Sequence, residues 1–192
     1  MKRFFAIPFV ALIIAASLMS CNRQQQAERI QQIDSLGAFL NHVSEVVQAV
    51  DSTQIEKRLL EMTTTGAWVF ENITDTLDRE SGLQFGDYMR CQKFYGKALQ
   101  RYIQVKKELR FSEAQLANLR ADVKNNLFSQ DEFRGYFKTE AVSVANLVKA
   151  ADELSGGYAS ANAQYNSTKP AVTQLIDSVK TVILSPVPVK RK

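Results

Sequence analysis

The sequence predicts an all-α protein, a single helical bundle of about five or six helices. Apolar residues recur at alternating spacings of three and four along most of the chain, the period of one buried helix face. Three Ser/Thr-x-x-Glu/Gln segments stand where helices would begin, and such capping boxes open helices. No segment shows the sustained apolar–polar alternation, bracketed by turns, that indicates strands. These patterns together favour helices packed against helices.

The predicted buried faces follow one another along the chain. In order they are Ile33, Leu36, Leu40, Val43, Val47 and Val50; Leu59, Met62, Gly66, Val69 and Ile73; Tyr88, Cys91, Tyr95, Ala98, Tyr102, Val105 and Leu109; Leu116, Leu119, Val123 and Leu127; Phe133, Phe137, Val144, Leu147, Ala151 and Leu154; and Val172, Leu175, Val179 and Val182.

Short polar segments separate these faces. Thr53-x-x-Glu56, Ser112-x-x-Gln115 and Ser129-x-x-Glu132 are predicted to open the second, fourth and fifth helices. Asp78 to Gly82 is predicted to be a loop.

The last part of the chain contains further breaks. Gly156-Gly157 is predicted to end the fifth helix, and residues 158–167 form either a thin helix or an ordered loop. Thr168-Lys169-Pro170 can start a last helix, because proline is tolerated in a first turn.

The first residues have the pattern of an export signal. A positive start (Met1-Lys2-Arg3) precedes an uncharged apolar run from Phe4 to Leu18. Leu18-Met19-Ser20-Cys21 then resembles the lipobox of bacterial lipoproteins, which implies that Cys21 is diacylated and becomes the first mature residue. The alternative is an uncleaved membrane anchor, but the run is short of the ~20 residues that span a bilayer, and Pro8 interrupts it.

This resemblance divides the chain into four parts. We expect a cleaved signal (1–20), a lipidated polar tether (21–29), a helical bundle (30–184) and a basic tail with two prolines (185–192). The resemblance implies a location in the bacterial cell envelope, held to the membrane by the lipid on Cys21. Asn22 after the cysteine slightly favours the outer membrane over the inner one, because in some Gram-negative bacteria an aspartate there retains lipoproteins in the inner membrane.

Composition excludes some functions. Without Lys2 and Arg3, 22 of the 24 basic residues remain against 20 acidic ones, a net charge of +2 that gives no reason to expect nucleic acid. With Cys21 acylated, Cys91 has no cysteine partner, so we expect no intramolecular disulfide.

No segment has the pattern of a catalytic or metal site, and we expect no enzyme and no cofactor. His42 is the single histidine and is interpreted as a surface or core-margin residue. Cys91 lies on a predicted buried face and is interpreted as an inert thiol. Seven glutamates are scattered along the chain and are mostly expected at solvated helix positions or in first turns: Glu56, Glu61, Glu71, Glu108, Glu113, Glu132 and Glu140. Gly-rich phosphate loops and nucleophile motifs are missing.

Tyr88, Tyr95 and Tyr102 stand in a row at seven-residue spacing. Such a row can line a groove for a glycan, a peptide or a lipid, because tyrosine joins an apolar ring to a polar tip. The alternative, which the helical spacing favours, is core packing.

An Asp-Ser/Thr pair followed by an aliphatic residue or threonine occurs four times, where composition predicts roughly half an occurrence. The triplets begin at Asp34, Asp51, Asp75 and Asp177. They resemble the acceptor motif of a general O-glycosylation system of some Gram-negative bacteria, which would place glycans on Ser35, Ser52, Thr76 and Ser178. The alternative is structural, since Asp-Ser pairs suit helix starts and turns.

Three functions are therefore weighed. The leading hypothesis is a non-enzymatic envelope lipoprotein that binds an envelope protein or serves as an accessory module of an assembly. The second is a binder of a small ligand, glycan or lipid between helices. The third is a hydrolase of cell-wall or glycan substrates acting through paired carboxylates.

Overall fold

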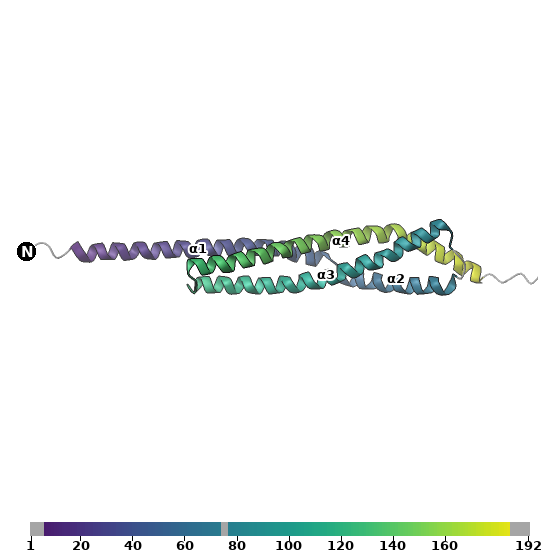
Figure 1. Cartoon of the computed structure of the whole chain (residues 1–192), viewed down its shortest axis with the longest axis horizontal. Helices are drawn as coiled ribbons and strands as arrows, with labels where there is room; N and C mark the ends of the chain where they lie inside the picture. Colours follow the sequence, from purple (N-terminus) through teal and green to yellow (C-terminus); the bar gives the residue numbers. More distant parts are fainter. Residues whose placement is uncertain (1–5, 74–76, 185–192) are drawn as a thin grey trace, which may run out of the picture. The chain divides into compact units, whose positions relative to one another are not determined.

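The chain folds into four helical segments: α1 (Ala6–Ala49), α2 (Ser52–Asn72), α3 (Arg79–Lys124) and α4 (Gln130–Leu184) (Figure 1). This computed structural model describes residues 6–73 and 77–184, and the side chains of residues 23–73 and 77–183. No strand occurs within these ranges, which confirms the all-α prediction. The prediction of five or six helices is wrong, because two predicted breaks are helical. The predicted tail, 185–192, lies outside the described residues.

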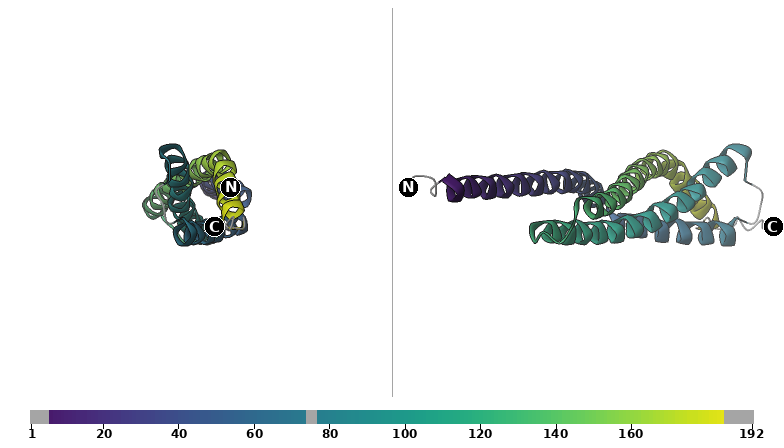
Figure 2. Two further views of the ribbon diagram at one scale, coloured as in Figure 1. Left: turned by 90° about the vertical axis from the view of Figure 1, so that its right-hand side faces the viewer. Right: turned by 60° about the vertical axis from the view of Figure 1, so that its left-hand side comes forward.

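The helices contribute to two compact units. Unit 1 combines residues 1–45 with 107–149, and unit 2 combines residues 46–106 with 150–192. In both units α3 and α4 run antiparallel, which can be followed in Figure 1 and in the right-hand view of Figure 2. The site described below lies wholly in unit 2.

The core of unit 1 joins one face of α1 to α3 and α4. Most residues that were predicted to be buried in this part of the chain are buried. They are Ile33, Leu36, Leu40, Val43, Leu109, Leu116, Leu119, Val123, Phe133, Val144 and Leu147. Leu127 was expected in this core, but it is 63% exposed because the chain leaves α3 at Lys124 and places Leu127 in the turn.

The core of unit 2 is richer in aromatic rings. Its buried residues are Val47, Val50, Ile55, Met62, Val69, Phe85, Tyr88, Cys91, Tyr95, Ala98, Val105, Ala151, Leu154, Ala161, Tyr165 and Val172. Val182 was predicted to be buried but is 74% exposed, because it lies in the last turn of α4.

The predicted start of a helix at Ser112 is wrong. Ser112 lies inside α3 and is buried. It stands between Leu109 and Leu116 on one buried face, so the three–four spacing passes through it unbroken. Continued burial of the face outweighs the local capping signal.

The predicted stop at Gly156-Gly157 and the predicted start near Pro170 are also wrong, because α4 passes through both. Neither glycine has a positive φ, the conformation that a glycine helix stop usually adopts. Pro170 costs α4 one hydrogen bond, at the carbonyl of Asn166, an exposed residue. The helix continues because the buried face resumes at Val172.

The true caps match the predictions in part. Asp51, rather than Thr53, caps α2, since its carboxylate accepts from the Gln54 N–H at 2.9 Å. The predicted capping box at Ser129 is confirmed, because the backbone N–H of Ser129 donates to the Glu132 carboxylate at 2.9 Å. Asp78 opens α3 by accepting from the N–H groups of Glu80 and Ser81, so the predicted loop there is the first turn of a helix.

The expected polar tether is also helical, because residues 22–29 belong to α1. The side-chain amide of Gln26 donates to the carbonyls of Val123 at 3.1 Å and Lys124 at 2.9 Å. These carbonyls lie in the last turn of α3, where helical donors run out, and that of Val123 also accepts from the Asn126 N–H at 3.1 Å. The tether segment is therefore ordered by capping another helix.

Candidate functional site: a polar network in unit 2

A group of polar side chains in mutual contact lies among α2, α3 and α4 in unit 2. Its members are Arg58 and Glu61 from α2, Tyr88 and Tyr95 from α3, and Asn162, Tyr165 and Lys169 from α4. Helical spacing places them together, because residues three, four or seven apart share one face. They flank the buried apolar residues of the same helices, so their polar ends meet at the margin of the core.

Arg58 joins the three helices. Its guanidinium donates to the hydroxyl of Tyr95 and to the side-chain carbonyl of Asn162. The Tyr95 hydroxyl in turn donates to the same Asn162 oxygen at 2.7 Å. Burial raises the pKa of Tyr95, against the opposing effect of the Arg58 charge, so the phenol stays neutral.

The same guanidinium also lies over an aromatic ring. Its central carbon is 4.5 Å from the ring centroid of Tyr165 and 5.6 Å from that of Tyr95. Such cation–π contacts are stronger where water is partly excluded, as it is here. Arg58 thus has both hydrogen-bond and ring partners inside the unit.

Glu61 is engaged at both oxygens. One oxygen pairs with the Lys169 ammonium at 2.8 Å, and the other accepts from the Tyr165 hydroxyl at 2.7 Å. Lys169 also donates to that hydroxyl at 2.9 Å, which closes a three-membered cycle. Burial opposes ionisation of Glu61, but the hydrogen bonds from Lys169 and Tyr165 outweigh it and lower the pKa. Bonding to Glu61 and Tyr165 raises the pKa of Lys169.

The tyrosine row predicted from the sequence lies mainly in the core. Tyr88 and Tyr95 are 1% and 0% exposed, and both rings pack against Tyr165, with centroids 5.8 Å and 6.0 Å away. Burial raises the pKa of Tyr88 to about 12. Tyr102 is half-buried, and its hydroxyl accepts from Lys106. Tyr88 and Tyr95 therefore pack in the core, as the helical spacing favoured, and do not line an open groove.

The other candidate residues predicted from the sequence do not come together in one site. Cys91 is a buried free thiol whose pKa is raised by burial. His42 is exposed on α1. Ser35 and Ser178 are exposed and Ser52 is half-buried at the start of α2. The side chain of Cys21, and Thr76, lie outside the described residues.

The aspartates of two triplets have structural partners. Asp34 pairs with Arg120 across unit 1 at 3.1 Å, and Asp51 caps α2. Asp51, at a helix start, fits the structural alternative, whereas Asp34 lies inside α1 and pairs with another helix.

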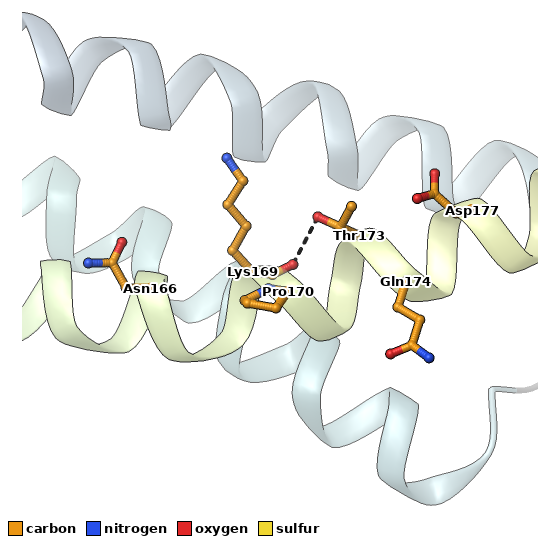
Figure 3. A pocket seen from close by; sticks show the side chains of 6 residues that line it. All are labelled: Asn166, Lys169, Pro170, Thr173, Gln174 and Asp177. Carbon is orange, nitrogen blue, oxygen red and sulfur yellow. Dashed lines mark hydrogen bonds between the residues drawn. The ribbon is translucent and has the colours of Figure 1, made fainter.

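Hollows lie on the surface of unit 2 among its described residues. A hollow of about 550 Å³ follows one side of α4 around Pro170, lined by Asn166, Lys169, Pro170, Thr173, Gln174 and Asp177 (Figure 3). There the Thr173 hydroxyl donates to the Lys169 carbonyl at 3.0 Å. Figure 3 shows the Lys169 side chain extending away from α4, and its ammonium is bonded to Glu61.

The second hollow is smaller and more enclosed, about 200 Å³ between α3 and α4. Phe94, Ala98, Leu154 and Gly157 give it apolar walls, and the Arg101–Glu153 ion pair of 2.9 Å lies at its edge. A Cβ on Gly157 would meet no atom within 4 Å, so the missing side chain contributes to the space.

The arrangement of the network indicates a structural role. A general acid or base needs a free position toward a substrate, whereas both Glu61 oxygens are bonded within the network. No group of three or more potential metal ligands occurs among the described residues. A satisfied network of this kind fixes the register of the packed helices.

Three members of the network, Glu61, Tyr88 and Tyr95, are candidates from the sequence. No sequence pattern indicated Arg58, Asn162, Tyr165 or Lys169 as site residues. Arg58 and Asn162 are separated by 104 positions, and no local pattern signals such a pair. The sequence did contain one signal for Tyr165, because this residue continues the buried helix face of Leu154 and Ala161.

Comparison of the chain with protein-family models, with curated proteins and with solved structures found no match. Among the residues that the structure describes, no helix combines the length and apolar character needed to cross a bilayer.

Proposed function

We propose that the protein is a lipid-anchored lipoprotein of the bacterial cell envelope whose helical units form a non-enzymatic protein-interaction or accessory module. The lipobox-like segment ending at Cys21 supports the anchor. Two or three acyl chains would hold the protein on a membrane, since each buried methylene contributes ~0.8 kcal/mol. The outer membrane is slightly favoured by Asn22.

The observation that carries the non-enzymatic part is the closed bonding of Glu61, Lys169 and Tyr165. The titratable groups of the network satisfy one another and hold helices together. Large apolar side chains instead face outward on unit 2, with Leu60 69%, Phe70 77% and Leu83 63% exposed. Exposed apolar side chains of this size supply area that a protein partner would bury.

Cross-linking in intact cells tests this function. Tagged, lipidated protein is cross-linked, purified and analysed by mass spectrometry, beside a Cys21→Ser variant. We expect one reproducible envelope protein that is lost from the variant. Absence of any cross-linked partner at good yield would contradict the interaction role, and an unmodified Cys21 in the native protein would contradict the anchor.

A second candidate function is binding of a small ligand in the hollow at Gly157. The apolar walls and the absent side chain of Gly157 favour it. Native mass spectrometry of protein purified from its host membrane would detect a bound molecule. Gly157→Leu should displace it while leaving the helices folded, and equal occupancy in the variant would exclude this site.

Glycosylation of the Asp-Ser/Thr triplets remains a separate proposal. Ser35 and Ser178 are exposed, as an acceptor must be, although their hydroxyls donate to the backbone carbonyls of Gln32 and Leu175. An intact mass of native protein without a sugar increment would rule the proposal out.

A further inference from the structure

The turn between α3 and α4 lies beside the part of α1 that follows Cys21. Gln26 bonds the carbonyls of Val123 and Lys124, and the Arg29 guanidinium donates to the carbonyl of Phe128 at 3.2 Å. Cys21 and Gln26 both belong to α1 and to unit 1. Five helical residues span about 7.5 Å, so the turn lies within about two helical turns of the cysteine.

The turn holds its apolar tip outward in a defined conformation. Asn126 has a φ of 55°, and the N–H groups of Asn126 and Leu127 donate to the carbonyls of Val123 and Asp122. This is a Schellman motif, which fixes the residues just after a helix. Leu127 is 63% exposed although its backbone is bonded.

An aromatic pair borders this tip. The ring of Phe128 packs against Tyr136 of α4 with centroids 5.1 Å apart, and Tyr136 is 57% exposed. The exposed polar side chains of Lys124 and Asn125 complete the turn. An apolar tip with tyrosine, lysine and amides beside it matches the boundary between lipid headgroups and acyl chains, where tyrosine and snorkelling lysine are favoured.

We propose that the α3–α4 turn contacts the lipid bilayer, with Leu127 entering the headgroup–acyl boundary. This inference rests on the proposed lipidation of Cys21, which brings the bilayer to this end of unit 1. The anchor makes the second contact intramolecular, so this contact needs less affinity than an independent membrane contact would. The contact would orient unit 1 with the turn toward the membrane.

The test uses the depth of a tryptophan in vesicles. The mature chain, residues 21–192, is coupled through Cys21 to a maleimide phospholipid in vesicles of neutral and anionic phospholipids. Cys91 is buried and does not compete for the reagent. Trp68, the single tryptophan, is replaced in Trp68→Phe, and either Leu127→Trp or Phe111→Trp is added. Phe111 is the matched control, because it is 60% exposed on α3 in the same unit.

We expect phospholipids brominated in their acyl chains to quench about half of the emission in Leu127→Trp and almost none in Phe111→Trp. Weak, equal quenching in both proteins would show that the turn stays in water. Strong, equal quenching would show that no particular surface faces the bilayer. A blue shift of Leu127→Trp without vesicles, growing with protein concentration, would show that a second copy covers the turn. Each of these three outcomes overturns the inference.

Chemical coupling keeps this test independent of the cell. The mass of the native protein separately reports whether Cys21 is acylated there. A native protein without acyl chains would refute the proposed anchor, whatever the quenching experiment shows. Quenching of the Leu127→Trp emission no stronger than that of a tryptophan in water would refute only the membrane contact of the turn.

Discussion

Glu61 of α2 and Lys169 of α4 form an ion pair of 2.8 Å, and Tyr165 bonds to both of them. The pair is only partly exposed, with 34% and 43% of the side chains accessible, and it joins segments more than a hundred residues apart. Isolated surface pairs contribute little to stability, but a pair that shares a third bonded group acts as a network. The tertiary structure of unit 2 therefore depends in part on this contact.

Replacing Glu61 should weaken unit 2 modestly. We expect Glu61→Gln to lower the free energy of unfolding by about 1 kcal/mol, because Lys169 loses its charge partner while solvent still screens it. Asp87→Asn is the control, since the Asp87–Arg90 pair is more exposed and lies within one helix. Urea unfolding followed by circular dichroism measures both. Equal effects of the two variants would contradict a special role of Glu61.

The same residue predicts a pH dependence. The pKa of Glu61 is lowered in the folded protein from its ordinary value of 4.5, so the ionised form favours folding. Its contribution should be fully present above pH 4.5 and lost as the pH falls through the lowered folded pKa. The stability difference between the natural protein and Glu61→Gln should therefore shrink on acidification. A difference that stays constant from neutral pH to pH values well below 4.5 would exclude this linkage.

Tyr95 should contribute through its hydroxyl as well as its ring. Tyr95→Phe keeps the packing against Tyr165 but removes a hydroxyl bonded to Arg58 and Asn162. We expect a loss of about 1–2 kcal/mol of unfolding free energy, the cost of leaving partly buried polar partners unpaired. Tyr102→Phe, half-buried on the same helix, should cost less than about 0.5 kcal/mol. Equal costs in thermal or urea unfolding would show that the Tyr95 hydroxyl is not a structural link.

Gly156 distinguishes a continuous α4 from the helix stop predicted at this place. The structure has Gly156 in mid-helix, exposed, with no positive φ and open space where a Cβ would be. Gly156→Ala should therefore raise the unfolding free energy by about 0.5–1 kcal/mol, because alanine favours helix and restricts the unfolded chain. At a true helix stop the φ is positive and alanine would destabilise the protein. The sign of the change decides between the two conformations.

The core faces of this chain could be predicted from the spacing of apolar residues, whereas the helix boundaries predicted at Ser112 and Gly156-Gly157 are wrong. The spacing of buried residues correctly predicted the core faces at Ile33 to Val50 and at Tyr88 to Leu109, with Tyr102 only half-buried. The spacing also passes unbroken through Ser112 and Tyr158, yet the local signals of serine and glycine were given more weight there. Burial along a whole face contributes more free energy than one cap or one glycine, so the continuous spacing was the better guide.

The network could not be predicted in the same way. Its pairs, such as Arg58 with Asn162 and Glu61 with Tyr165, join residues 104 positions apart. Which residues of α2 lie opposite which residues of α4 depends on the lengths of the helices. Both α3 and α4 are longer than the sequence patterns predicted. An error in helix length therefore hides every such contact, even where each face is correctly predicted.

Gln26 provides the last test, because the sequence predicted a polar tether where the structure has an ordered helix. Its amide donates to the carbonyls of Val123 and Lys124 at the end of α3. Gln26→Ala should lower the unfolding free energy by about 1 kcal/mol, the usual contribution of a helix cap. Gln25→Ala, at an exposed neighbouring position, should leave stability unchanged. Faster amide hydrogen exchange in residues 124–128 of the Gln26→Ala protein alone would place the effect at the turn. Equal stability and exchange in both variants would mean that residues 22–29 act as the tether that the sequence predicted, and that the turn is not held beside the lipidation site.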